Sequence, residues 1–180
     1  METADFVAVA CSAPYFRPYT QTDVIGVELG GAVKNVIALV VGIADGLGFG
    51  DNTKASIITR GLAETTRLAV AVGAEPATMA GLAGMCDLVA TCASPLSRNR
   101  RFGSLLGRGL TVEEAVEASR QTAEAVTSCG PILELARRHG VEMPLTEIVV
   151  AVLQGVIPVD QLPARLLGRP RVGEVTDREA

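Results

Sequence analysis

One lysine and one asparagine, Lys34 and Asn35, stand side by side in an otherwise apolar segment that covers residues 30–38. Removing an ammonium group from water is costly, so a buried lysine needs a carboxylate partner or a route to the surface. The plainer alternative is a surface lysine whose stem lies along an apolar helix. The segment is the first place to look for acid–base chemistry.

A second candidate lies in a later apolar segment, where Asp87 and Thr91 are four residues apart. A helix there would place both side chains on one face. The carboxylate of Asp87 could then serve as the partner of a nearby cation.

A third candidate is the run Ser97-Arg98-Asn99, which Arg100 and Arg101 follow. A guanidinium binds an oxyanion with two parallel hydrogen bonds, and a helix beginning near Ser97 would add backbone N–H donors. The run therefore suits a phosphate or a carboxylate. The alternative is an N-capped helix with a solvated basic first turn, but basic residues at a helix start oppose the helix dipole.

Helices must position these groups, because strand-like segments are confined to residues 6–11 and 15–29. Hydrophobic spacing and capping signals predict the remaining elements. The expected helices cover residues 32–45, a segment from Asp51 or Asn52 to Val72, a segment that a capping box at Thr111 opens, and residues 131–139 (with Gly140 as a stop), 145–154 and 159–167.

Composition excludes several classes of protein. With 180 residues, 48% of them hydrophobic, and a net charge of -4, the chain is expected to be one globular domain and no general nucleic-acid binder. Its four cysteines show no paired spacing, and its first residues are acidic where a signal peptide is basic. The longest apolar run, residues 36–44, is far shorter than a membrane span. We expect a cytoplasmic protein with reduced thiols and no membrane segment.

Three common kinds of site are also disfavoured. The loop 46–51 is not a G-x-G-x-x-G fingerprint and follows no strand signal. His139, the sole histidine, lies at an expected helix end, so we expect no metal site. No serine has the Gly-x-Ser-x-Gly context of a hydrolase nucleophile.

Several motifs occur in a fixed order along the chain: Ile25–Ala38, Ile58–Glu64, Gly81–Cys92, Ser97–Gly103 and Val141–Pro144. Together they resemble the C-terminal, substrate-binding half of bacterial NAD(P)+-dependent glycerol-3-phosphate dehydrogenase. The resemblance implies an all-α, multi-helix domain like the C-terminal domain of 6-phosphogluconate dehydrogenase. We expect short strand remnants at its N-terminus.

The resemblance also implies roles for single residues. Lys34 matches the general base, and Asp87 matches the carboxylate that pairs with it, both in contact with the substrate. The remaining implied contacts are to the substrate at Thr91, Ser97, Arg98 and Asn99, and to the cofactor at Arg98, Thr122 and Glu124. Cys86 and Ala125 depart from the family pattern, where glycine is usual, and could shift the local backbone.

We expect three parts of the chain. Residues 1–31 would be a strand-rich remnant of the cofactor-binding half or a linker, residues 32–168 the helical substrate-binding and catalytic domain, and residues 169–180 a flexible tail. The first part holds no glycine-rich phosphate loop. NAD or NADP would therefore be bound mainly by a missing or separate Rossmann domain, and the chain alone would be inactive.

Two hypotheses of different classes follow. The first is the catalytic half of an enzyme that interconverts sn-glycerol 3-phosphate and dihydroxyacetone phosphate for glycerophospholipid synthesis. The alternative is a non-catalytic helical dimerisation or ligand-binding domain. A homodimer fits both, because apolar helix faces such as residues 62–72 could pair. Another member of the hydroxy-acid dehydrogenase superfamily would share the fold but should lack the Ser-Arg-Asn triplet.

Overall fold

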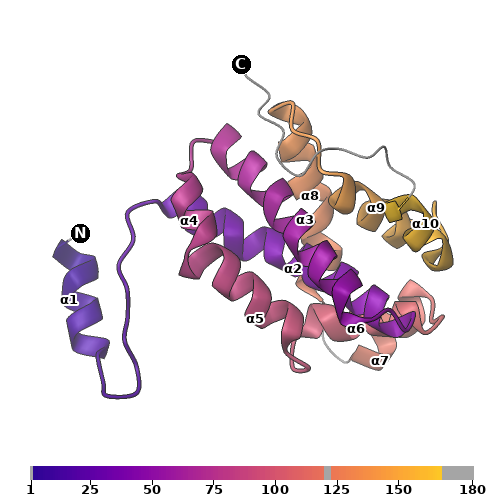
Figure 1. Ribbon diagram of the computed structural model, residues 1–180, viewed down its shortest axis with the longest axis horizontal. Helices are drawn as coiled ribbons and strands as arrows, with labels where there is room; N and C mark the ends of the chain where they lie inside the picture. Colours follow the sequence, from indigo (N-terminus) through magenta and orange to yellow (C-terminus); the bar gives the residue numbers. More distant parts are fainter. Residues whose placement is uncertain (1, 120–122, 168–180) are drawn as a thin grey trace.

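A computed structural model describes residues 2–119 and 123–167, and within these ranges it contains helices and no sheet (Figure 1). The expected all-α class is confirmed, whereas the expected tail 169–180 lies outside the described residues. In chain order the elements are α1 Glu2–Cys11, α2 Val24–Gly46, α3 Asp51–Ala71, α4 Pro76–Ala80, the π-helix η1 Leu82–Cys86, α5 Asp87–Ala93, α6 Arg98–Gly107, α7 Val112–Ser119, α8 Glu124–Arg138, α9 Pro144–Leu153, the 3₁₀ helix η2 Val159–Gln161 and α10 Leu162–Leu167.

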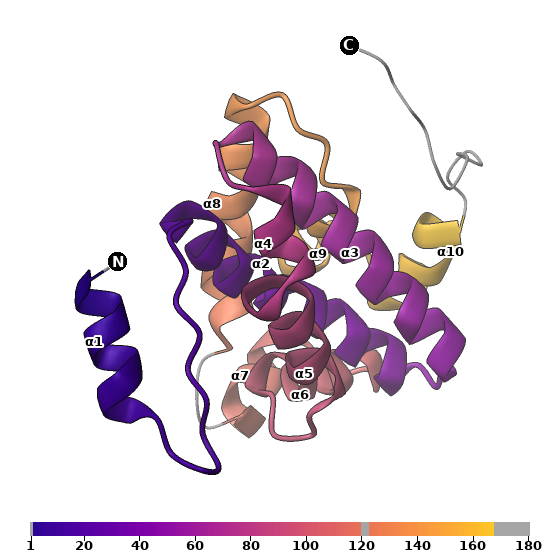
Figure 2. The same cartoon turned by 60° about the vertical axis from the view of Figure 1, so that its left-hand side comes forward.

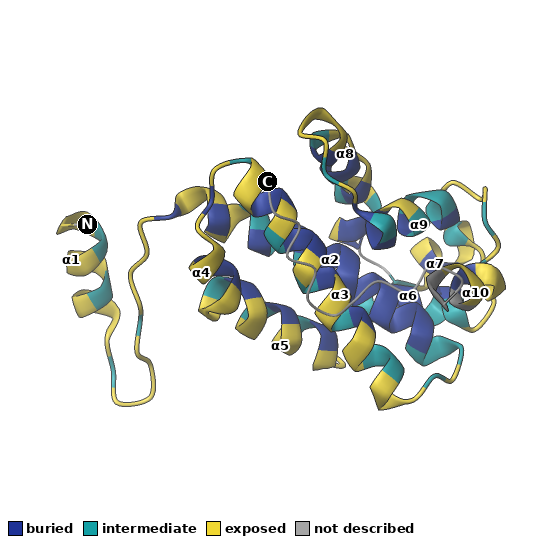
Figure 3. Cartoon of the chain, turned by 45° about the horizontal axis from the view of Figure 1, so that its top comes forward, coloured by how far each residue is buried: buried dark blue, intermediate teal, exposed yellow. Residues whose placement is uncertain are grey.

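Helix α2 is the centre of the domain, and α3, α5, α6 and α8 pack around it. Its second half is almost entirely buried (Figure 3). Among the described residues it is also the one helix long and apolar enough to cross a membrane by length and composition. More than half of its most apolar window is buried against other helices, and the core helix of a globular domain passes the same test.

The start of α2 depends on a buried carboxylate. The expected helix 32–45 begins eight residues earlier, at Val24, because Asp23 caps it. One Asp23 oxygen accepts a hydrogen bond from Gly26 N at 2.9 Å, and the other accepts one from Glu75 N at 2.8 Å. The Thr78 hydroxyl and these two N–H donors lower the pKa of the Asp23 carboxyl.

Asp23 should make the domain acid-sensitive. Its folded-state pKa lies below the unfolded value of about 4, so ionised Asp23 stabilises the fold above that pH, and the contribution is lost as the pH falls through the folded-state pKa. We expect Asp23→Asn to be less stable than the parent at neutral pH and to lose less stability on acidification. Urea unfolding at about pH 7 and about pH 3.5 measures both; parallel losses would contradict the prediction.

The two strand predictions are wrong. Residues 6–11 lie in α1, and residues 15–29 form an extended segment followed by the first turns of α2, with one isolated bridge between Ala13 and Phe16. Figure 2 shows α1 standing apart from the helical body, and none of its residues is buried. A strand needs a neighbour to satisfy its backbone groups, and no described segment offers one, so residues 2–11 bond locally as a helix.

Local capping signals were more reliable. The box at Thr111 is confirmed: Thr111 N donates to Glu114 Oε2 at 2.8 Å, and Glu114 N donates to Thr111 Oγ1 at 3.2 Å. The stop at Gly140 is confirmed by its positive φ of 66°. The predicted helix 131–139 was too short, because α8 begins at Glu124 and accommodates Pro131 in its interior.

Two other capping groups differ from expectation. Helix α3 begins at Asp51 after Gly50, which makes no side-chain cap hydrogen bond, so neither Asp51 nor Asn52 is its N-cap. Helix α9 is capped from a distance: Glu64 on α3 accepts a hydrogen bond from Leu145 N at 2.8 Å. This hydrogen bond holds the start of α9 against α3.

Glycines allow α2 and α6 to touch along their backbones. A Cβ atom on Gly42 would lie 2.0 Å from the Arg100 carbonyl oxygen, and one on Gly103 would lie 2.1 Å from the Leu39 carbonyl oxygen. Such distances leave no room for a side chain. The contact holds the first turn of α6, which carries Arg98 and Asn99, against α2.

Candidate functional site

The first part of the site is an ion pair between α2 and α5. Lys34 Nζ donates to Asp87 Oδ2, and Thr91 Oγ1 donates to Asp87 Oδ1 at 3.3 Å. The side chains of Lys34 and Asp87 are 22% and 41% exposed, so the pair is half-buried and open to a ligand. Asp87 and Thr91 share one helix face, as their spacing predicted.

Two backbone features bring Asp87 to Lys34. Asp87 directly follows η1, and π-helical turns are frequent at functional sites. Gly30 lets η1 approach α2, since a Cβ atom there would lie 2.7 Å from the Ala83 carbonyl oxygen. The ion pair between Lys34 and Asp87 therefore depends on the backbone of η1 and on Gly30 of α2.

The second part of the site is the start of α6. Ser97 is its N-cap, and Ser97 Oγ accepts a hydrogen bond from Arg100 N at 3.3 Å, which confirms the expected helix start. The basic residues then diverge. Arg98 is half-exposed and faces α8, Arg100 pairs with Asp45 at 3.1 Å, and Arg101 is exposed.

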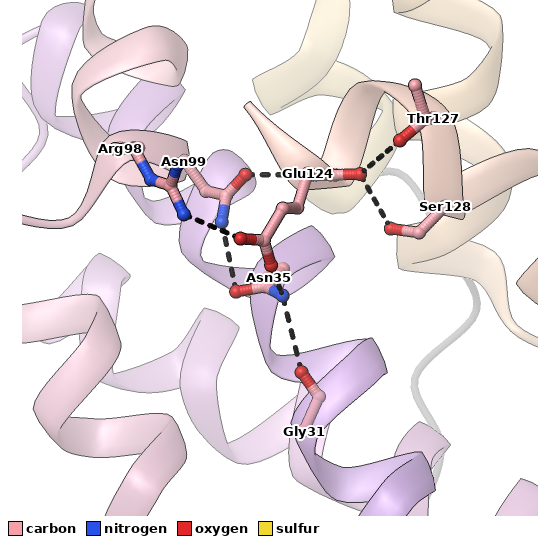
Figure 4. Close-up of polar contacts among 8 residues, drawn as sticks. Gly31, Asn35, Arg98, Asn99, Glu124, Thr127 and Ser128 are labelled. Atoms are coloured by element: carbon pink, nitrogen blue, oxygen red, sulfur yellow. Dashed lines mark hydrogen bonds and ion pairs between the residues drawn. The ribbon is translucent and has the colours of Figure 1, made fainter. Parts of the chain in front are cut away.

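Figure 4 shows the network that joins α2, α6 and α8. Asn99 Nδ2 donates to Asn35 Oδ1 at 2.9 Å, and Asn35 Nδ2 donates to Glu124 Oε2 at 3.0 Å. The other Glu124 oxygen accepts from Arg98 Nη2 at 2.6 Å. Asn99 Oδ1 accepts from Ala125 N at 2.9 Å and so caps the start of α8.

Asn35 connects the two parts of the site. It is buried and adjacent in sequence to Lys34, and it contacts both Asn99 and Glu124. The sequence drew attention to Asn35 but assigned it no place in the site. A polar amide inside an apolar helix was the available signal, because such a group must find hydrogen-bond partners when it is buried.

The predicted substrate residues differ in what they can still offer a ligand. Arg98 is half-exposed, and the Ser97 hydroxyl keeps its proton available for donation. Asn99 is buried, with its carbonyl oxygen and one amide hydrogen already used. The predicted cofactor residue Thr122 lies outside the described residues.

Among the other reactive groups, the Cys86 thiol is exposed and directly precedes Asp87, whereas the Cys92 and Cys129 thiols are buried. All four cysteines are free thiols, and burial raises the pKa of Cys92 to about 12. His139 lies at the C-cap of α8, where the sequence placed it. Within the two described ranges, no three His, Cys, Asp or Glu side chains gather as a metal site would require.

Comparison with known proteins agrees with this geometry. The family model described as NAD-dependent glycerol-3-phosphate dehydrogenase C-terminus matches residues 23–164. The chain belongs to this glycerol-3-phosphate dehydrogenase family. The match begins at Asp23, the cap of α2, and includes Lys34, Asp87 and the whole of α6.

Individual glycerol-3-phosphate dehydrogenases are closely similar. The NAD(P)+ enzymes of Streptomyces coelicolor and Thermobifida fusca are each 66% identical to this chain, over 87% and 91% of it. The crystal structure of the Coxiella burnetii glycerol-3-phosphate dehydrogenase is 42% identical, with a TM-score of 0.89 over 93% of this chain. The chain covers 47% and 49% of the two curated relatives and 52% of the crystallised chain, about half of each.

Cys86 and Ala125, the two positions where the resemblance led us to expect glycine, lie beside the candidate site. Cys86 is exposed and ends η1, next to Asp87. Ala125 is buried, and its backbone N–H is the group that Asn99 caps. Neither side chain prevents the contacts described above.

Proposed function

We propose that this chain is the substrate-binding and catalytic half of an enzyme that interconverts sn-glycerol 3-phosphate and dihydroxyacetone phosphate with NAD(P)(H), for glycerophospholipid synthesis. The observation that carries the proposal is the placement of an acid–base pair and a guanidinium on one connected site. Lys34 and Asp87 lie on one side of Asn35, and Arg98 lies on the other, through Asn99 and Glu124.

Lys34 would move the proton. In the oxidative direction its neutral amine would accept the proton of the secondary hydroxyl; in the reductive direction its ammonium would protonate the carbonyl oxygen. Asp87 would orient the amine and stabilise its charged form, and Thr91 would hold the second Asp87 oxygen in place.

Arg98 would bind the phosphate group of the substrate, because a guanidinium offers two parallel donors to an oxyanion. The Ser97 hydroxyl lies at the start of the same helix and would add a neutral donor. Asn99 would contribute through its remaining amide hydrogen and by fixing the first turn of α6 against α2 and α8.

The cofactor would be NAD or NADP, which supplies the hydride acceptor or donor when bound. Arg98 and Glu124 suit the edge of such a site, since one offers a half-exposed cation and the other an exposed acceptor for hydroxyl groups. Thr122 would be the third contact. We propose that most of the cofactor contacts come from a Rossmann domain to which the residues ahead of α2 connect, rather than the expected residues 1–31, because α2 already begins at Val24. Turnover would then require that domain.

The experiment that tests the phosphate site is a binding titration with sn-glycerol 3-phosphate. We expect Arg98→Ala to weaken binding about tenfold or more, because a charge-assisted hydrogen bond to the phosphate is lost. Arg138→Ala is the matched control, since Arg138 is also an exposed arginine paired with a glutamate on a helix. Equal affinities of the Arg98→Ala and Arg138→Ala variants would contradict the proposed site.

The alternative, a non-catalytic dimerisation domain, is favoured by an open, largely apolar groove along α3. Its lining residues are Thr59, Leu62, Ala63, Thr66, Arg67, Val70 and Ala71. We propose a cytoplasmic homodimer under either function. Concentration-dependent association without any response to the phosphate ligand would support the alternative.

A further inference from the structure

The Arg98 guanidinium already holds an anion from its own chain. Arg98 Nη2 lies 2.6 Å from Glu124 Oε1, within the range of a strong charge-assisted hydrogen bond. The other oxygen, Glu124 Oε2, accepts from the buried Asn35 at 3.0 Å. Arg98 on α6 and Asn35 on α2 therefore hold the Glu124 carboxylate beside the guanidinium (Figure 4).

The charges of the site are balanced before any ligand arrives. Lys34 is paired with Asp87, and Arg98 is paired with Glu124, so these four side chains sum to zero. A phosphate monoester brings a charge between -1.5 and -2 near pH 7. If Glu124 stayed in place, the phosphate would meet a neutralised guanidinium and a like charge beside it.

We propose that Glu124 is a displaceable internal ligand of Arg98, which competes with a phosphate for the guanidinium. The inference rests on the proposed phosphate site at Arg98. It adds that Glu124 and the phosphate compete for the same guanidinium. An attached carboxylate acts at high effective concentration and lowers the affinity of every external anion by the same factor. A phosphate offers three acceptor oxygens and extra charge, so it can overcome this barrier, whereas a monocarboxylate offers Arg98 nothing new.

Displacement of Glu124 would also affect the part of the site that contains Lys34 and Asp87. Glu124 also accepts a hydrogen bond from Asn35, the residue next to Lys34, so movement of the carboxylate away from Arg98 would alter that contact. Binding of the phosphate at α6 would therefore change the contacts of a buried amide on α2. The start of α8 is coupled to ligand binding through this exchange.

The test compares Glu124→Gln with the parent chain by NMR titration with sn-glycerol 3-phosphate. Glutamine keeps an oxygen for Asn35 but removes the charge that holds Arg98. We expect affinity to rise about fivefold, the factor for releasing one half-exposed ion pair. Glu134→Gln is the matched control, because Glu134 lies on the same helix, pairs with Arg138 and is 54% exposed, against 56% for Glu124.

A double-mutant cycle separates competition from a merely structural role. In an Arg98→Ala background, Glu124→Gln should raise the affinity much less than it does in the parent chain, because no guanidinium remains to be released and only the like charge is removed. Affinity that stays the same or falls in Glu124→Gln overturns the inference, while loss of binding in Arg98→Ala would still support the phosphate site. Absence of binding in every variant overturns both, since removing the competitor should expose a working anion site.

Discussion

Replacing Lys34 with methionine should lower kcat for dihydroxyacetone phosphate reduction about a thousandfold, within the range that one positioned acid–base group contributes. The carbonyl oxygen would lose its proton donor, while Arg98 would still bind the phosphate. We therefore expect the KM for dihydroxyacetone phosphate to change far less than kcat.

The measurement needs a complete enzyme. A suitable one is a chimera in which residues 23–164 replace the matched half of the Streptomyces coelicolor relative, which is 66% identical to this chain. Oxidation of NADH and of NADPH is followed with dihydroxyacetone phosphate as the substrate. The chain alone should show no turnover in the same assay, since hydride transfer needs a bound cofactor.

Lys54→Met is the matched control for Lys34→Met. Lys54 has the same side-chain exposure, 22%, and pairs with Asp45 at 3.1 Å and with Asp51 at 2.9 Å. Removing it deletes an equally buried cation outside the proposed site, so kcat should stay close to the parent value. If both variants lost activity equally, Lys34 would act through stability or net charge, and its proposed role as acid and base would be wrong.

Gly42→Ala should be the most destabilising of the glycine-to-alanine substitutions in α2. The new Cβ atom would lie 2.0 Å from the Arg100 carbonyl oxygen, and backbone cannot move aside as a flexible side chain can. Helices α2 and α6 would have to separate, at a cost of about 3 kcal/mol, the upper part of the range for overpacking a core. Urea unfolding followed by circular dichroism measures the loss.

The matched control is Gly31→Ala on the same helix. A Cβ atom on Gly31 meets nothing within 4 Å, so alanine should leave stability unchanged or raise it by up to about 1 kcal/mol through its better helix propensity. Equal stability of the Gly42→Ala and Gly31→Ala variants would show that α2 and α6 do not need their close contact.

The same contact links stability to the site. Gly103 on α6 faces the Leu39 carbonyl oxygen on α2, so each helix contributes a glycine to the close backbone contact. Separating them would move Asn99 away from Asn35, which it contacts at 2.9 Å. Gly42→Ala protein that still folds should therefore bind sn-glycerol 3-phosphate more weakly than Gly31→Ala protein.

The sequence by itself determined the elements whose signals are local. The capping box at Thr111 and the cap at Ser97 could be predicted from the sequence, because each needs only residues within four positions in the chain. The spacing of Asp87 and Thr91 predicted their shared helix face for the same reason. The resemblance to a dehydrogenase half then gave the pairing of Lys34 with Asp87, which the structure contains.

Only the tertiary structure decided which distant groups meet. Asn35 lies between Asn99 and Glu124, which are 64 and 89 positions away in the chain, and Glu64 caps a helix that begins 80 residues later. The strand-like segment 6–11 became a helix because strand formation depends on a neighbouring strand. Periodicity and caps act over a few residues, whereas the partner of a buried polar group is set by how closely two helices pack, here by Gly42 and Gly103.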